Sequence, residues 1–136
     1  MGKMKVDLLR DLPGEIDELK KDLVRLKNGE REAAERIKRR AHSIKSCASF
    51  FPELEKMRGI SYNMEMLFCK IEDGRLELTG EILKLAEDAG DIIARLGKGE
   101  DVETTNMEAL FEKYLTTKVT KEKSQRTQRE IFKKTL

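Results

Sequence analysis

The chain has 136 residues, of which 40% are charged and 38% are hydrophobic, and its formal net charge is only +2. This length suits one domain, and the low net charge gives no general reason to expect nucleic-acid binding. Nine Gly and two Pro are too few for an all-β fold with many tight turns. No apolar run approaches the roughly 20 residues of a membrane helix, and no signal peptide opens the sequence, so we expect a cytoplasmic protein without membrane contact.

Four segments carry hydrophobic residues at the spacing of an amphipathic helix. Their apolar positions are, in chain order, Leu12, Ile16, Leu19, Leu23 and Leu26; Ala34, Ile37, Ala41, Ile44 and Ala48; Met57, Ile60, Met64, Leu67 and Ile71; and Ile82, Leu85, Ala89, Ile92 and Leu96. The alanines of the second set allow a neighbouring helix to approach closely. The pattern predicts four helices of similar length.

Turn and capping residues place the ends of the first two helices. Pro13 is expected in the first turn of the first helix, after a short N-terminal piece with Val6, Leu8 and Leu9, and Asn28-Gly29 ends this helix. The second helix is expected over about residues 30–51. Pro52 cannot continue it and is expected near the first position of the third helix.

The third helix is expected to end at Asp73-Gly74. Thr79 is a candidate N-cap for the fourth helix, which Gly97 and Gly99 close. Four helices joined by short loops predict an all-α fold, an antiparallel up-and-down four-helix bundle, with residues 1–100 as its domain.

Residues 101–136 are expected to form an accessory region. Residues 100–106 read as a polar loop, followed by a short fifth helix with Met107, Leu110, Phe111, Tyr114 and Leu115. Residues 116–136 hold seven basic and two acidic side chains, 7 − 2 = +5. Such a stretch is more often a solvated linker or helix than a nucleic-acid arm. A linker would favour a fragment of a larger kinase over a free-standing protein.

Cysteine and histidine are scarce. Cys47 and Cys69 lack the spacing of zinc ligands and lie next to apolar positions, so we interpret both as core residues. With one histidine in the chain, no metal site is expected.

The single histidine, His42, follows Ala41 and therefore lies at the edge of the apolar stripe of the second helix. The side chains three and four positions away are basic or small and hydroxylated, namely Lys38, Arg39, Lys45 and Ser46, and Glu35 and Ser49 lie a further turn out. Cations and hydroxyls of this kind suit the oxygens of a phosphoryl group. The pattern alone would fit a solvated basic stripe equally well.

The segment from Arg40 to Phe51, RAHSIKSCASFF, resembles the motif of histidine phosphotransfer domains, Ala-His-Ser/Thr-Ile/Leu-Lys-Gly. The nearest resemblance is to the N-terminal phosphotransfer domain, P1, of the chemotaxis sensor kinase CheA. The segment from Asp73 to Thr79 is similar to that family's loop between its third and fourth helices, and the likeness covers about residues 8–99.

This resemblance implies that His42 is the phosphoacceptor, that Lys45 helps to hold the phosphoryl group, and that Glu65 hydrogen-bonds the imidazole. A carboxylate that accepts a hydrogen bond from the Nδ1–H leaves the Nε2 lone pair available and makes the ring a better nucleophile. Tyr62 stands where CheA-like domains usually carry a second histidine. The positions Ser46, Ser49 and Pro52 are usually glycine, which changes how closely a partner approaches.

The implied function is relay of a phosphoryl group from the ATP-binding domain of a histidine kinase to the aspartate of a response-regulator receiver. Lys38, Arg39, Ser46, Ser49 and Tyr62 are the candidates for partner docking or phosphoryl contact. No nucleotide-binding motif is present, so ATP and Mg²⁺ are expected to act through the partner domains, with no cofactor bound here. Two alternatives stay open: a helical adaptor that has lost the relay, and nucleic-acid binding through residues 116–136.

Overall fold

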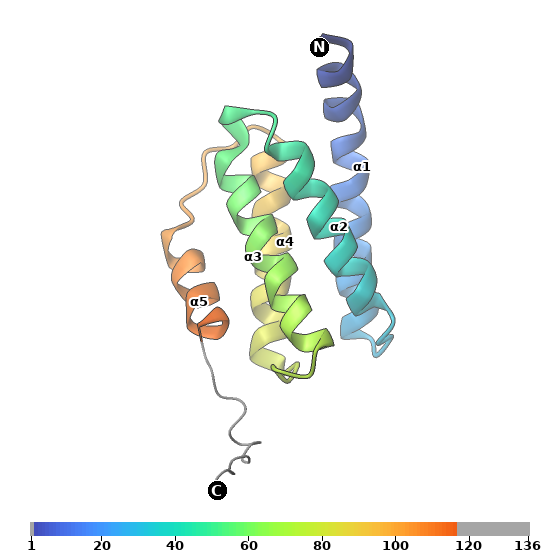
Figure 1. The fold of residues 1–136 in the computed structure, drawn as a ribbon, viewed down its shortest axis with the longest axis vertical. Helices are drawn as coiled ribbons and strands as arrows, with labels where there is room; N and C mark the ends of the chain where they lie inside the picture. The colour runs from blue at the N-terminus through green and yellow to red at the C-terminus, as the bar shows by residue number, and fades with distance from the viewer. Residues whose placement is uncertain (1, 117–136) are drawn as a thin grey trace, which may run out of the picture.

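The computed structural model describes residues 2–116, with side chains from Leu8 onward. The fold is all-α, as the hydrophobic pattern predicted (Figure 1). Its elements are α1 (Gly2–Lys27), α2 (Ala33–Ala48), the short 3₁₀ helix η1 (Pro52–Leu54), α3 (Glu55–Glu72), α4 (Gly80–Gly97) and α5 (Thr105–Leu115). In the part of the chain that these elements cover, no helix combines the length and the apolar character needed to cross a membrane.

The first four helices form an antiparallel bundle. α1 packs against α2 and α4, and α3 packs against the same two helices, so that the four enclose one core. α5 lies outside this bundle against α3 and α4 (Figure 1). Short loops between consecutive helices account for this up-and-down order, because they leave room only for an antiparallel neighbour.

The predicted capping residues Gly29, Gly74 and Thr79 mark helix boundaries, the two glycines at helix ends and Thr79 at a helix start. Gly29 and Gly74 have φ of 102° and 79°, in the left-handed region that side chains with a Cβ rarely adopt. Thr79 is the N-cap of α4, because its Oγ1 accepts a hydrogen bond from the Ile82 N–H at 3.2 Å.

Three predicted helix boundaries were wrong, and one of them is the start of α3, which begins at Glu55 because Pro52 opens the separate 3₁₀ helix η1. Pro13 lies inside α1 and not in its first turn, so the expected separate N-terminal piece is part of one helix of 26 residues. Proline has no N–H to donate to the carbonyl of Leu9, and the exposure of Leu9 and Pro13 lets water replace that bond. α2 ends at Ala48, three residues early, because Phe51 must be extended ahead of Pro52 (φ −128°, ψ 111°).

The core contains most of the predicted apolar positions. Four of them are only half-buried and pack at its margin: Ala34, Ile71, Ile92 and Leu96. The fully buried Ala33 and Ile93, next in sequence to Ala34 and Ile92, were not predicted, and neither was the fully buried Phe68 next to Leu67. These additional buried positions arise because each helix here touches two neighbours, which widens the buried stripe beyond a single line.

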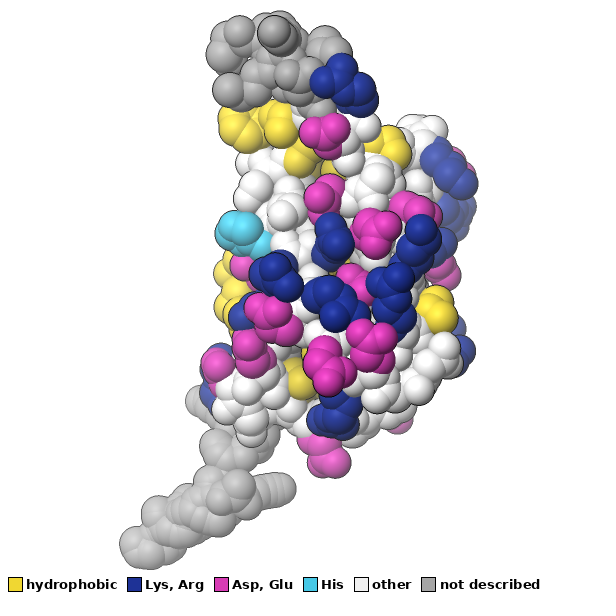
Figure 2. Space-filling view, turned by 90° about the vertical axis from the view of Figure 1, so that its right-hand side faces the viewer, with side chains coloured by type: hydrophobic (Ala, Val, Ile, Leu, Met, Phe, Trp, Pro, Cys, Tyr) yellow, Lys and Arg dark blue, Asp and Glu magenta, His cyan; other side chains and the backbone are white. Residues whose placement is uncertain are grey.

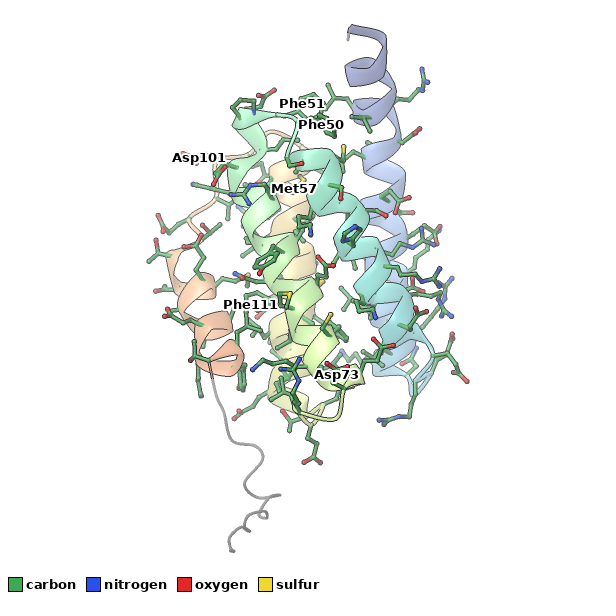
Figure 3. The ribbon with its side chains drawn as sticks, viewed as in Figure 1. Phe50, Phe51, Met57, Asp73, Asp101 and Phe111 are labelled. Atoms are coloured by element: carbon green, nitrogen blue, oxygen red, sulfur yellow. The ribbon has the colours of Figure 1, made fainter. Side chains whose placement is uncertain are left out.

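The fifth helix was predicted correctly, but the loop between α4 and α5 differs from the polar loop that was expected. Phe111 and Met107 anchor α5, and Figure 3 shows Phe111 between α5 and α3. The preceding loop is less polar than expected, since Val102 and Thr104 are buried and Lys56 donates a hydrogen bond to the carbonyl of Val102 at 2.9 Å. The basic stretch from residue 117 onward lies outside the described residues.

Candidate functional site

The site lies on the seam between α2 and α3, and the core of α2 determines where His42 points. Ala41 and Ile44 are fully buried on either side of it in sequence. His42 therefore emerges at the edge of the buried stripe, with 57% of its side chain exposed. The histidine, cyan in Figure 2, stands at the margin of the molecule. This exposure allows another protein to reach the ring.

Glu65 on α3 faces His42 across the seam. It follows the fully buried Met64, which places its carboxylate just outside the core, and its side chain is only 16% exposed. The distance between His42 Nδ1 and Glu65 Oε2 is 2.8 Å, a short hydrogen bond. The second nitrogen, Nε2, lies on the opposite edge of the ring from this contact.

The ionisation of Glu65 fixes which nitrogen carries the proton. Burial raises the pKa of Glu65, but the neighbouring Lys45 and His42 together lower it by more, and the pKa lies below its ordinary value. Near neutral pH the carboxylate is ionised and can only accept hydrogen bonds. Nδ1 must therefore donate, and in the neutral ring Nε2 keeps its lone pair.

Lys45 completes the group. Its Nζ lies 3.0 Å from Glu65 Oε1, so that the two carboxylate oxygens serve two partners, His42 and Lys45. The same ammonium lies 5.5 Å from the centroid of the Tyr62 ring, within the range of a cation–π contact. The structure thus brings together four residues that the sequence singled out. Their catalytic roles stay predictions.

The outer candidates are spread along the exposed side of α2. Lys38 pairs with Glu72 at the end of α3, and Arg39 pairs with Glu35 one turn earlier on its own helix, at 3.2 Å. Both positive charges are thus partly balanced within the domain. Ser46 and Ser49 are exposed, and the Ser49 hydroxyl donates to the carbonyl of Ser46 at 2.7 Å.

The arrangement is an exposed imidazole with an anchored Nδ1 and a cation beside it. In a comparison with known protein families, the model of the Hpt domain family matches residues 3–98. The chain belongs to the Hpt domain family. It matches no curated protein and no solved structure. Hpt domains generally relay phosphoryl groups between kinases and receivers.

One cluster of this Hpt domain was not predicted from the sequence. Asp22 is a fully buried carboxylate in α1, 2.7 Å from Arg25 and 3.0 Å from Arg36. Arg40 lies 3.6 Å from its other oxygen. On the face that Figure 2 presents, Lys and Arg side chains are intermixed with Asp and Glu side chains. A carboxylate between Leu19 and Leu26 at helical spacing was the available signal, and the cluster ties α1 to α2.

The cysteines are free thiols, and the interpretation of both as core residues was half correct. Cys47 is buried, which raises the pKa of its thiol, whereas Cys69 is only half-buried. Between residues 2 and 116, no three His, Cys, Asp or Glu side chains group as metal ligands.

Proposed function

We propose that this Hpt domain accepts a phosphoryl group on Nε2 of His42 from the ATP-binding domain of a histidine kinase and passes it to a receiver aspartate. The observation that carries the proposal is the 2.8 Å contact between Nδ1 and the half-buried carboxylate of Glu65, on a ring that is 57% exposed. An anchored nitrogen and an accessible one are what an acceptor imidazole requires.

In the first step, the Nε2 lone pair attacks the γ-phosphorus of ATP held by the kinase. The P–N bond forms as the bond from phosphorus to the bridging oxygen breaks, and ADP leaves with that electron pair. The ring keeps its Nδ1 proton and becomes positively charged. Glu65 stabilises this charge, because its ionised carboxylate already faces Nδ1.

In the second step, a carboxylate oxygen of the receiver aspartate attacks the same phosphorus. The P–N bond breaks, and its electron pair returns to Nε2, which restores the neutral ring. Lys45 is placed to offset phosphoryl charge in both steps, because it follows His42 by three residues on α2 and its Nζ lies 3.0 Å from the carboxylate that also contacts His42. Mg²⁺ and the acidic residues that bind it are supplied by the kinase and the receiver.

Docking would cover the exposed side of α2 around His42. Ser46 and Ser49 are small, so a partner can approach the helix closely on that side. Lys38 and Arg39 offer positive charge to the acidic rim of a receiver, reduced by their pairing with Glu72 and Glu35. A partner's acidic groups would have to displace these carboxylates.

The subtype is proposed from the motif. The segment 40–51 and the loop 73–79 favour a P1-type domain of a CheA-like chemotaxis kinase, acting in the cytoplasm, with residues 1–100 as the phosphotransfer unit and residues 101–136 as an accessory region. α5 packs mainly on α3 and α4. It therefore leaves the exposed side of α2 accessible.

The test is incubation of the full chain with a CheA-type kinase ATP-binding domain and [γ-³²P]ATP. We expect a phosphate that is labile in acid and stable in alkali, present in the unmutated chain and absent in His42→Gln. A complex with the kinase or a receiver that forms without any labelled phosphate would instead establish the helical adaptor and overturn the relay.

A further inference from the structure

The ammonium of Lys45 is held between two side chains of α3. Its Nζ lies 3.0 Å from Glu65 Oε1 and 5.5 Å from the centroid of the Tyr62 ring. Tyr62 and Glu65 are three residues apart and therefore lie on the same face of α3. Lys45 in turn follows His42 by three residues on α2, so the pair of contacts lies directly beside the imidazole.

Each contact restricts Lys45 in a different way. The carboxylate of Glu65 is 16% exposed and attracts the ammonium at a point, whereas the ring face of Tyr62 attracts it over a broad area. A lysine side chain has a long flexible stem and would otherwise sample many rotamers in water. With both contacts in place the Lys45 side chain is only 24% exposed.

The two contacts differ in what happens when charge arrives on His42. The attraction of a cation to a ring face is only weakly directional, so Lys45 can turn from Glu65 towards a phosphoryl oxygen without leaving Tyr62. Tyr62 contacts the Lys45 ammonium through its ring face. The role therefore requires an aromatic side chain and does not require a phenol.

We infer that Tyr62 is a positioning residue, whose ring face holds the Lys45 ammonium beside Glu65 so that the lysine is in place when His42 is phosphorylated. This inference rests on the proposed function. It assigns to Tyr62 an action on Lys45 within the domain, which is distinct from contact with a partner. No bond to Tyr62 forms or breaks.

The first experiment measures the contact without phosphorylation. In NMR spectra of the full chain, the Lys45 Hε protons, assigned by their absence in Lys45→Met, should be shifted upfield by the ring. Tyr62→Phe should keep this shift and Tyr62→Leu should remove it. Tyr62 is 46% exposed, so neither change should unfold the protein. Lys45 Hε shifts that are the same in Tyr62→Leu as in the unmutated chain overturn the inference.

The second experiment measures phosphorylation of His42 by phosphoramidate, a small donor that needs no docking partner. Tyr62→Leu should be about three- to tenfold slower than the unmutated chain, and Tyr62→Phe should restore the rate. In a Lys45→Met background, Tyr62→Leu should have no further effect. Phe50→Leu is the matched control, because Phe50 is an exposed aromatic, 54% accessible, at the end of the same seam.

The outcomes separate this inference from the proposed function. An unmutated chain that shows the ring-induced shift but takes no phosphate on His42 overturns both. A chain that is phosphorylated normally, and in which Tyr62→Leu has no effect or the same effect with and without Lys45, overturns the role of Tyr62 alone.

Discussion

Glutamine in place of Glu65 removes the negative charge beside His42 and keeps an oxygen that can accept a hydrogen bond from the Nδ1–H. The contact at risk is a 2.8 Å hydrogen bond to an ionised group that is 16% exposed. Hydrogen bonds to charged groups contribute about 1.5–3 kcal/mol. If this contact strengthens as the ring gains positive charge, its loss slows phosphorylation by about 10- to 150-fold, at about 1.4 kcal/mol for each factor of ten.

The two substitutions divide this range. Glu65→Gln should lie near its lower end, about tenfold, because the amide oxygen still orients the ring. Glu65→Ala should lie near its upper end, about 100-fold, because orientation and charge are both lost. The rate is measured with phosphoramidate as donor, so that docking does not enter, and folding is checked by circular dichroism.

Glu55→Gln is the matched control, since Glu55 lies on the same helix, has 71% of its side chain exposed and pairs with Arg58. It should phosphorylate at the rate of the unmutated chain. If Glu65→Gln and Glu65→Ala also keep that rate while both remain folded, the carboxylate does not activate His42 and the reasoning is refuted.

Three other substitutions test the surroundings of the site. Asp22→Asn should lower the free energy of unfolding by about 2–3 kcal/mol at pH 7, less than a fully buried pair would lose because the arginines reach water. Burial raises the pKa of Asp22, but Arg25 and Arg36 together lower it by more, so the pKa lies below its ordinary 3.8. The stabilisation is therefore present above pH 3.8 and is lost as the pH falls through the lowered pKa. If urea titrations show the same deficit in Asp22→Asn at pH 2 as at pH 7, the assignment is wrong. Phe111→Ala removes the fully buried anchor of α5 and should raise amide hydrogen exchange throughout that helix, while His42 is phosphorylated at an unchanged rate; a slower rate would mean that α5 supports the site. Lys38→Ala should slow transfer from a kinase domain at low salt only, and a deficit that survives at 1 M salt would show that Lys38 acts on the chemistry and not on docking.

The bundle could be predicted from the sequence because local signals and the hydrophobic pattern agree. Gly29, Gly74 and Thr79 each mark a helix end through backbone geometry that depends on one residue. Pro13 was misjudged because the packing of Leu12 and Ile16 on either side holds the helix together despite one missing hydrogen bond. Tertiary contacts there outweigh a local preference.

The site could be predicted only in part. Spacing along α2 places Lys45 next to His42, because both belong to one helix. Nothing within α3 fixes its register against α2, so the 2.8 Å approach of Glu65 was accessible only through the family resemblance. The contact of Tyr62 with Lys45 could not be anticipated, since it depends on rotamers of two side chains from different helices.

The most direct test of the account is the position of the phosphorus on the ring. The full chain, labelled with ¹⁵N in its single histidine, is phosphorylated and studied by ¹H–¹⁵N and ³¹P NMR. We predict phosphorus bonded to Nε2 of His42, with the proton still on Nδ1 facing Glu65. Phosphorus on Nδ1, or on any residue other than His42, would contradict the account.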